Sequence, residues 1–192
     1  MNATDTYEES IQRTLFTPAE IAQAIDRLAH QIAEDHRGQP VMLLGVLKGA
    51  LYVVSDLARA LSAVADGPSE IVLDYICVSS YGNSTRSSGE VRMLKDSSRP
   101  VTGRAVVIVE DIIDNGLTLQ YLRSLLQERK PASLRSCVLF DKPYHRRVDV
   151  PVDYVGLQAP DEFVVGYGLD YQELFRNLPY LAQLRAAVFQ EK

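Results

Sequence analysis

Short apolar runs alternate with amphipathic helical patterns along most of the chain. Helical patterns are predicted at residues 18–36, 50–61 and 117–129. Between them lie runs of strand length that are almost wholly apolar, as expected for strands buried on both faces of a sheet: VMLLGVL, IVLDYICV, AVVIV and LRSCVLF. This alternation predicts an α/β fold with a central, mainly parallel sheet covered by helices on both faces.

The first helix has a clear start signal. Thr17 and Glu20 have the spacing of a capping box, and Pro18 occupies the first helical position, where its missing N–H costs nothing. We expect this helix to reach about His36, before Gly38 ends it. In contrast, the polar residues 79–100 have the composition of an excursion or flexible lid rather than of a core element.

Composition narrows the class of protein. The chain has 192 residues, 46% of them hydrophobic, which is enough for one sizeable core. Its 20 basic and 25 acidic side chains give a net charge of −5, so we expect no nucleic-acid partner. No 18-residue apolar run and no leader-like N-terminus occur, and Cys77 and Cys137 lie within apolar runs, as reduced thiols do. We therefore expect a soluble, cytoplasmic protein without a membrane partner.

Three acids follow the central strand. Glu110, Asp111 and Asp114 come at the carboxyl end of AVVIV, just before a helix, and ligands of open α/β sheets bind at this edge. The simpler interpretation is that they are solvated loop acids that favour a helix N-terminus through its dipole. Three acids within five residues, joined to a glycine-containing turn, favour a ligand site.

The turn after these acids can hold a phosphate. Residues 114–118 supply successive backbone N–H groups, a glycine that can take positive φ, and a hydroxyl at a helix N-terminus. Because carboxylates repel a phosphate, the two must bind different parts of one ligand, and a sugar phosphate satisfies both: its hydroxyls can donate to Glu110 and Asp111. No Walker A motif occurs, which disfavours nucleoside triphosphate hydrolysis by that machinery.

The segment VVIVEDIIDNGLT resembles the phosphoribosyl pyrophosphate (PRPP) signature of type I phosphoribosyltransferases. Further segments occur in the order found in hypoxanthine-guanine phosphoribosyltransferases, so that the resemblance spans roughly residues 10–185: LLGVLKGA, SSYGNSTRSSGEVRMLKD, LFDKP and PDEFVVGYGLDYQELFRNLPY. It implies one phosphoribosyltransferase domain over residues 1–192. The core would span about 37–160, and the N- and C-terminal segments would form a small hood where the base binds.

The resemblance also implies a reaction. Members of this family transfer the 5-phosphoribosyl group from PRPP to hypoxanthine or guanine with Mg²⁺, and IMP or GMP and pyrophosphate are formed. They usually assemble as homodimers or homotetramers. The sequence leaves the preference among hypoxanthine, guanine and xanthine open, because small changes in the hood can decide it.

Family roles can be carried onto the acid-rich segment. The acids that match Glu110 and Asp111 hold the ribose hydroxyls directly or through Mg²⁺, and Asp114 is similar to the general base near N7 of the purine. The 5′-phosphate is bound by the residues that match Asp114, Asn115, Gly116, Leu117 and Thr118.

Pyrophosphate contacts are implied elsewhere in the chain. They match Leu47, Lys48, Gly49 and Arg176, and the family's Leu47–Lys48 bond can be cis, which the sequence cannot show. Ser80 and Tyr81 match contacts of a mobile lid that keeps water from the ribosyl cation.

The implied purine-binding residues are Lys142, Phe163, Val164 and Asp170. Lys142 matches the lysine that donates to O6, which favours a 6-oxopurine over adenine. Phe163 resembles the aromatic residue that stacks on the base, and Val164 resembles the residue whose backbone reads the base edge. Asp170 is similar to an acid that holds a second Mg²⁺ on the pyrophosphate side.

Two other classes stay open at this point. A nonenzymatic regulator on the same fold could bind RNA and sense nucleotides, although the acidic chain has no basic stripe. A phosphoacceptor signalling domain also carries acids at strand ends, but its acidic pair would be expected near the N-terminus, and the polar residues 79–100 would be hard to explain.

Overall fold

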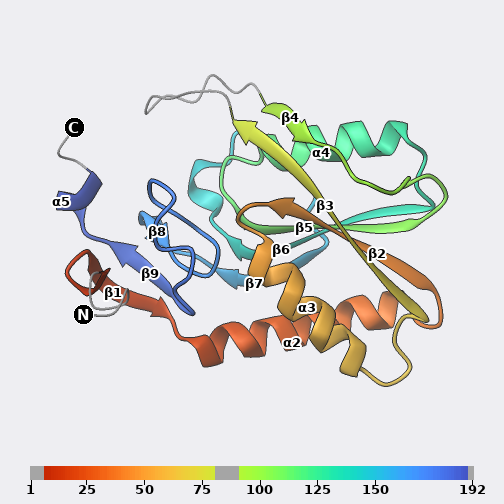
Figure 1. Ribbon diagram of the computed structural model, residues 1–192, viewed down its shortest axis with the longest axis horizontal. Helices are drawn as coiled ribbons and strands as arrows, with labels where there is room; N and C mark the ends of the chain where they lie inside the picture. Colours follow the sequence, from red (N-terminus) through yellow and green to blue (C-terminus); the bar gives the residue numbers. More distant parts are fainter. Residues whose placement is uncertain (1–6, 81–90, 190–192) are drawn as a thin grey trace.

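A mainly parallel sheet forms the centre of the molecule (Figure 1). The computed structural model describes residues 7–80 and 91–189, and within them six strands form this sheet. All neighbouring pairs except the one at the β4 edge are parallel, which confirms the predicted fold class. The strand order across the sheet is β4 (Val91–Lys95), β3 (Glu70–Ser80), β2 (Pro40–Leu47), β5 (Ala105–Ile113), β6 (Ser133–Asp141) and β7 (Tyr154–Gln158).

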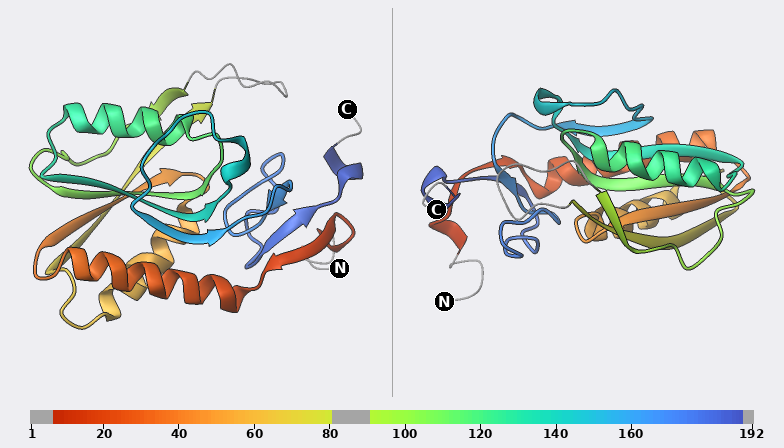
Figure 2. Two further views of the ribbon diagram at one scale, coloured as in Figure 1. Left: turned by 180° about the vertical axis from the view of Figure 1, so that it is seen from behind. Right: turned by 90° about the horizontal axis from the view of Figure 1, so that it is seen from above.

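Helices cover both faces of this sheet, as predicted (Figures 1 and 2). α2 (Pro18–Asp35) and α3 (Leu51–Ala63) pack on one face, and α4 (Leu117–Glu128) packs on the other. The capping box at the start of α2 is confirmed, since the Thr17 N–H donates to Glu20 Oε2 at 2.8 Å and the Glu20 N–H donates to Thr17 Oγ1 at 3.3 Å.

The prediction for residues 79–100 is partly wrong. β4 pairs antiparallel with β3 at the edge of the sheet, with Val91 opposite Ser80. An edge strand exposes one face and one row of backbone groups to water, so polar side chains such as Arg92 and Lys95 are tolerated there. Residues 96–100 belong to no helix or strand, as predicted. Tyr81 and the other residues of 81–90 lie outside the described residues.

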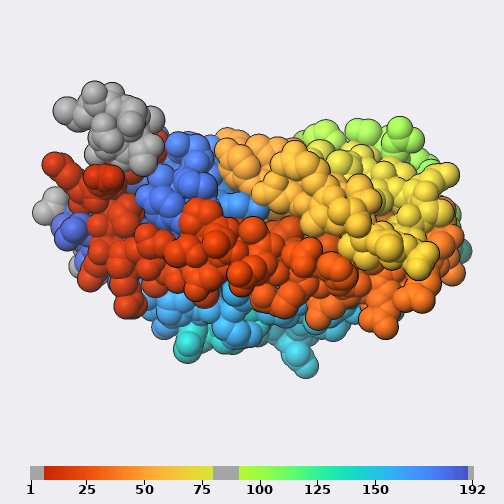
Figure 3. All heavy atoms as spheres, turned by 90° about the horizontal axis from the view of Figure 1, so that it is seen from below, coloured from red at the N-terminus to blue at the C-terminus, as the bar shows by residue number. Residues whose placement is uncertain are grey.

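A second, antiparallel sheet joins the two ends of the chain. β1 (Ile11–Phe16) pairs with β9 (Leu181–Leu184), and β9 pairs with β8 (Val164–Val165). The short helix α5 (Ala186–Phe189) follows β9. We call residues 7–16 and 162–189 the hood. Figure 3 shows the red N-terminal and blue C-terminal parts of the hood side by side at one end of the molecule.

No helix in the described part of the chain is both long and apolar enough to cross a membrane.

The packing of β7 against β6 yields a test of the fold. A Cβ added to Gly156 would lie 2.6 Å from the Leu139 carbonyl oxygen, a backbone atom held in the sheet. We expect Gly156→Ala to lower the free energy of unfolding by about 1–3 kcal/mol in urea denaturation, because the strands must separate to admit the methyl group. Val155→Thr, at an exposed neighbour in β7, is the control and should change stability little. Equal stability of both variants would contradict this packing.

Candidate active site

The turn between β5 and α4 forms a small polar cavity. Gly116 precedes the first residue of α4 and has φ +84°, a conformation that favours glycine, and the Leu117 N–H donates to Asn115 Oδ1 at 2.9 Å. The cavity has a volume of about 190 Å³, and its lining includes Glu110, Asp114, Asn115, Gly116 and Thr118. The first N–H groups of a helix have no partner within the helix. Together with the positive end of the α4 dipole, they make this turn suitable for an anion.

The loop after β6 packs against the turn between β5 and α4. The Arg147 N–H donates to the Asn115 carbonyl at 2.9 Å. A Cβ added to Gly116 would lie 3.1 Å from Val148 and 3.2 Å from both Arg146 and Val150. Glycine is therefore favoured at position 116 by space as well as by backbone conformation.

Glu110 is a buried acid without a partner. Its side chain lies in the cavity lining, the residue is only 6% exposed, and its Oε1 has no hydrogen-bond partner among the described residues. Burial, and secondarily the charge of Asp111, raise the pKa of the Glu110 carboxyl to about 8. A buried, unpaired carboxyl oxygen is costly for folding and marks a place where a ligand donor can bind.

Asp111 contacts the loop between β2 and α3. It lies near the end of β5, which continues past both acids to Ile113. A Cβ added to Gly49 would lie 1.7 Å from Asp111 Oδ2, so the β2–α3 loop packs directly on this carboxylate. Burial raises the pKa of Asp111 to about 6, although hydrogen bonds from backbone N–H groups and the nearby Arg176 guanidinium oppose this rise.

A second cavity adjoins the first beneath the hood. Its volume is about 230 Å³, and it is lined by Ile112, Asp114, Lys142, Glu162, Phe163, Val164 and Leu169. Ile112 and Asp114 belong to both cavities. Asp114 Oδ1 is buried and has no hydrogen-bond partner in the described part of the chain. One ligand can therefore extend from the anion-binding turn, past Asp114, to the aromatic ring of Phe163.

Lys142 is held in place at the wall of the second cavity. Its side chain is only 14% exposed, and its Nζ donates to the Glu162 carbonyl at 3.0 Å and lies 3.5 Å from Asp161 Oδ1. His145 Nε2 lies 2.9 Å from Asp161 Oδ1. Asp161 and Glu162 were not predicted as site residues, although both lie in the segment PDEFVV.

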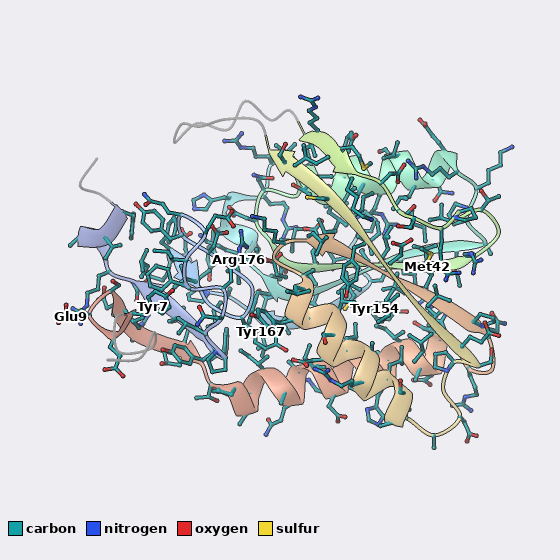
Figure 4. All side chains as sticks on the ribbon, viewed as in Figure 1. Tyr7, Glu9, Met42, Tyr154, Tyr167 and Arg176 are labelled. Carbon is teal, nitrogen blue, oxygen red and sulfur yellow. The ribbon has the colours of Figure 1, made fainter. Side chains whose placement is uncertain are left out.

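Two ion pairs lie close to the loop between β2 and α3. Lys48 Nζ is 2.6 Å from Glu173 Oε2, and the Leu47–Lys48 peptide bond is cis. Figure 4 shows Arg176 on the side of the hood nearest the large sheet. Its Nη2 is 2.6 Å from Asp170 Oδ1, and its Nη1 donates to the Gly168 carbonyl at 2.7 Å. Sequence reasoning did not find Glu173, because the loop and the hood are far apart in the chain.

The residues predicted to hold metal do not form one cluster. Within residues 7–80 and 91–189, no three carboxylate, histidine or cysteine side chains are grouped as a metal site. Asp111 packs on Gly49 of the β2–α3 loop, and Asp170 is paired with Arg176. Of the two predicted lid residues, the Ser80 backbone ends β3, and Tyr81 lies outside the described residues.

Comparisons with known proteins identify similar chains. The phosphoribosyl transferase domain model matches residues 12–172. The hypoxanthine-guanine phosphoribosyltransferase of Bacillus subtilis is 43% identical over 183 residues, which cover 95% of this chain and 98% of the relative.

Two solved structures are similar over nearly their whole length. A hypoxanthine phosphoribosyltransferase from Staphylococcus aureus has a TM-score of 0.87 at 39% identity, and the alignment covers 96% of this chain and 97% of that one. The hypoxanthine phosphoribosyltransferase from Trypanosoma cruzi, in complex with its product IMP, has a TM-score of 0.86 at 43% identity, with 94% and 98% covered.

The pKa of Glu110 makes stability depend on pH. The folded chain holds this proton up to about pH 8, whereas an unfolded glutamate loses it near 4.5. The contribution of Glu110 to the free energy of unfolding is therefore fully present below pH 4.5 and is lost as the pH rises through about 8. Urea denaturation at several pH values measures this effect. Between these limits, the free energy of unfolding of the ligand-free protein should fall by up to about 1.4 kcal/mol per pH unit relative to that of Glu110→Gln.

The control for this measurement is Glu128→Gln, which removes an exposed carboxylate at the end of α4. Its unfolding free energy should run parallel to that of the unchanged protein across the same pH range. If the Glu110→Gln curve is parallel as well, Glu110 is not the titrating group.

Proposed function

The chain belongs to the phosphoribosyl transferase domain family, and from this premise we propose that it transfers the 5-phosphoribosyl group from PRPP to hypoxanthine or guanine. The products are IMP or GMP and pyrophosphate, so the reaction salvages purines. The observation that carries this function is the pair of adjoining cavities that share Asp114, one suited to a phosphate and the other to a planar base.

The ligand is proposed to lie along these cavities. Its 5′-phosphate would accept hydrogen bonds from the turn at residues 114–118. The donors would be the backbone N–H groups of Asn115 and Gly116, the hydroxyl of Thr118, and the Leu117 N–H once it leaves Asn115 Oδ1. The ribose hydroxyls would donate to Glu110 and Asp111. Such donors would satisfy the unpartnered Glu110 Oε1 and favour its ionised form.

Asp114 is proposed to be the general base. The purine must lose a proton as one of its ring nitrogens attacks C1 of the ribose, and the bond from C1 to pyrophosphate breaks. Asp114 Oδ1, buried and unpartnered between the two cavities, is available to accept that proton. A carboxylate near C1 also stabilises the positive charge that develops on the ribose.

Base recognition is proposed to come from the second cavity. Lys142 Nζ has one N–H left beyond its contacts with Glu162 and Asp161, and this N–H would donate to O6 of the purine. The ring of Phe163 offers a stacking surface, and the backbone of Val164 in β8 would read the edge of the base. A cation at O6 repels a 6-amino group, so adenine should be excluded.

The pyrophosphate is proposed to bind at the β2–α3 loop. Leu47, Lys48, Gly49 and Arg176 would provide cations and backbone N–H groups, once Lys48 exchanges its contact with Glu173 for the ligand. Asp111, packed on Gly49, would face the bond that breaks.

Mg²⁺ is the proposed cofactor, and the donors present fit it. Carboxylate oxygens are hard ligands, and Mg²⁺ commonly takes only one or two of them, together with substrate phosphates and water. Glu110 and Asp111 would hold one ion with the ribose hydroxyls, and Asp170 a second on the pyrophosphate side. With Mg²⁺ bound, pyrophosphate departs with part of its charge neutralised.

Three further features are proposed from the family. The chain would work as one domain over residues 1–192, with a core of about 37–160 beneath the hood. It would assemble as a homodimer or homotetramer in the cytoplasm. The predicted lid contacts of Ser80 and Tyr81 stay predictions.

The first test of this function is a choice of bases. With PRPP and Mg²⁺, spectrophotometric assay should show nucleotide formation with hypoxanthine or guanine and none with adenine or uracil. The physical reason is the Lys142 ammonium, which needs an acceptor at position 6. Turnover of adenine at a comparable rate would contradict the role of Lys142. If no nucleotide forms with any base, the proposed function is contradicted.

The second test concerns Asp114. Asp114→Asn should leave PRPP binding, measured by calorimetry, within about threefold and lower kcat by roughly 10²–10⁴-fold, because an amide cannot accept the proton. Asp149→Asn, at an exposed position in the loop behind the phosphate turn, is the matched control and should keep full activity. An unchanged kcat in Asp114→Asn would remove it as the base.

A further inference from the structure

The Phe163 ring is covered on one side by the C-terminal helix. The rings of Phe163 and Phe189 are stacked, with centroids 4.7 Å apart and an interplanar angle of 21°. Tyr171 meets Phe163 edge-on, at 5.7 Å and 86°. Phe163 is nevertheless 39% exposed and lines the second cavity, whereas none of the described residues of α5 does. The Phe163 ring therefore stacks on Phe189 and also borders the cavity.

Other contacts fix α5 independently of Phe163. Tyr171 Oη donates to the Val188 carbonyl at 3.2 Å, and the Arg185 N–H just before α5 donates to the Ser10 carbonyl at 2.9 Å. Arg185 Nε donates to the Ile11 carbonyl at 3.0 Å. Val188 and Phe189 also pack against the apolar cluster of the hood. The position of Phe189 is thus set by the hood and does not depend on a bound base.

A stacking surface serves a ligand best when its orientation is fixed before binding. The Phe163 backbone is anchored, since its carbonyl accepts from the Leu184 N–H at 2.9 Å, but backbone anchoring alone does not hold a partly exposed ring at one angle. The parallel Phe189 ring and the perpendicular Tyr171 ring restrict it from two directions. Such preorganisation reduces the conformational entropy that is lost when a base binds.

We propose that Phe189 is a positioning residue for the purine site. It holds the Phe163 ring so that a planar base stacks on the face opposite Phe189, in a three-layer arrangement of base, Phe163 and Phe189. This inference rests on the proposed function, because it concerns how the base of that reaction is oriented. It gives the C-terminal helix a part in base binding without direct contact with the base.

The experiment is a comparison of Phe189→Ala, Phe189→Leu and Phe189→Tyr in the full chain. The loss of an aromatic pair predicts that the alanine and leucine variants raise KM for hypoxanthine and weaken IMP binding roughly three- to tenfold. KM for PRPP should stay within about twofold. The tyrosine variant keeps the ring and should restore purine KM to that of the unchanged protein. Ala187→Ser, at an exposed position of the same helix, should leave both KM values unchanged.

The outcomes separate this inference from the proposed function. If the unchanged protein transfers no phosphoribosyl group to any purine, the proposed function fails. If it is active and Phe189→Leu keeps purine KM, or binds purine more tightly, the positioning role is overturned. Equal changes in the KM values for purine and PRPP, with a lower melting temperature, would mean that Phe189 only stabilises the hood, which also overturns it.

Discussion

The burial of β5 on both faces is the constraint on which the rest of the structure depends. Val106, Val107, Ile108 and Val109 are each 0% exposed, and the strand is paired with β2 on one side and β6 on the other. A strand held in this way cannot slip without moving apolar side chains out of two cores. The acids at its carboxyl end are therefore held in fixed positions.

The same burial sets the electrostatics of the site. Taking carboxyl groups out of water favours their neutral forms, which is why the pKa of Glu110 rises to about 8 and that of Asp111 to about 6. The ligand-free chain keeps an unsatisfied Glu110 Oε1 at the cost of some stability. Ribose hydroxyls or a divalent cation would satisfy this oxygen, and the stability regained in this way would contribute to ligand affinity.

Sequence reasoning succeeded where structure depends on local pattern. The apolar runs predicted the buried strands, and Thr17, Pro18 and Glu20 predicted the start of α2, because strand burial and helix capping need only neighbouring residues. The turn after Asp114 was likewise found from its glycine and its place between a strand and a helix. The packing of Asp111 on Gly49 was not predicted, because it depends on a contact between β5 and the β2–α3 loop.

The contacts that complete the site were not predictable in this way. Glu173 meets Lys48 across 125 positions of sequence. Phe189 meets Phe163 because β8, which follows Phe163, pairs with β9, which precedes α5. β8 has two residues and β7 five, too short for a clear period-2 pattern. Such contacts depend on how the hood packs on the core, which no local signal encodes.

The central claim is that one nucleotide occupies both cavities, with Asp114 between its phosphate and its base. The direct measurement is calorimetric titration with IMP in the presence of saturating ribose 5-phosphate, and separately of saturating hypoxanthine. The claim predicts that each fragment lowers the apparent IMP affinity by simple competition, because each occupies one of the two cavities. An IMP affinity unchanged by either fragment would show that the two cavities do not share one ligand.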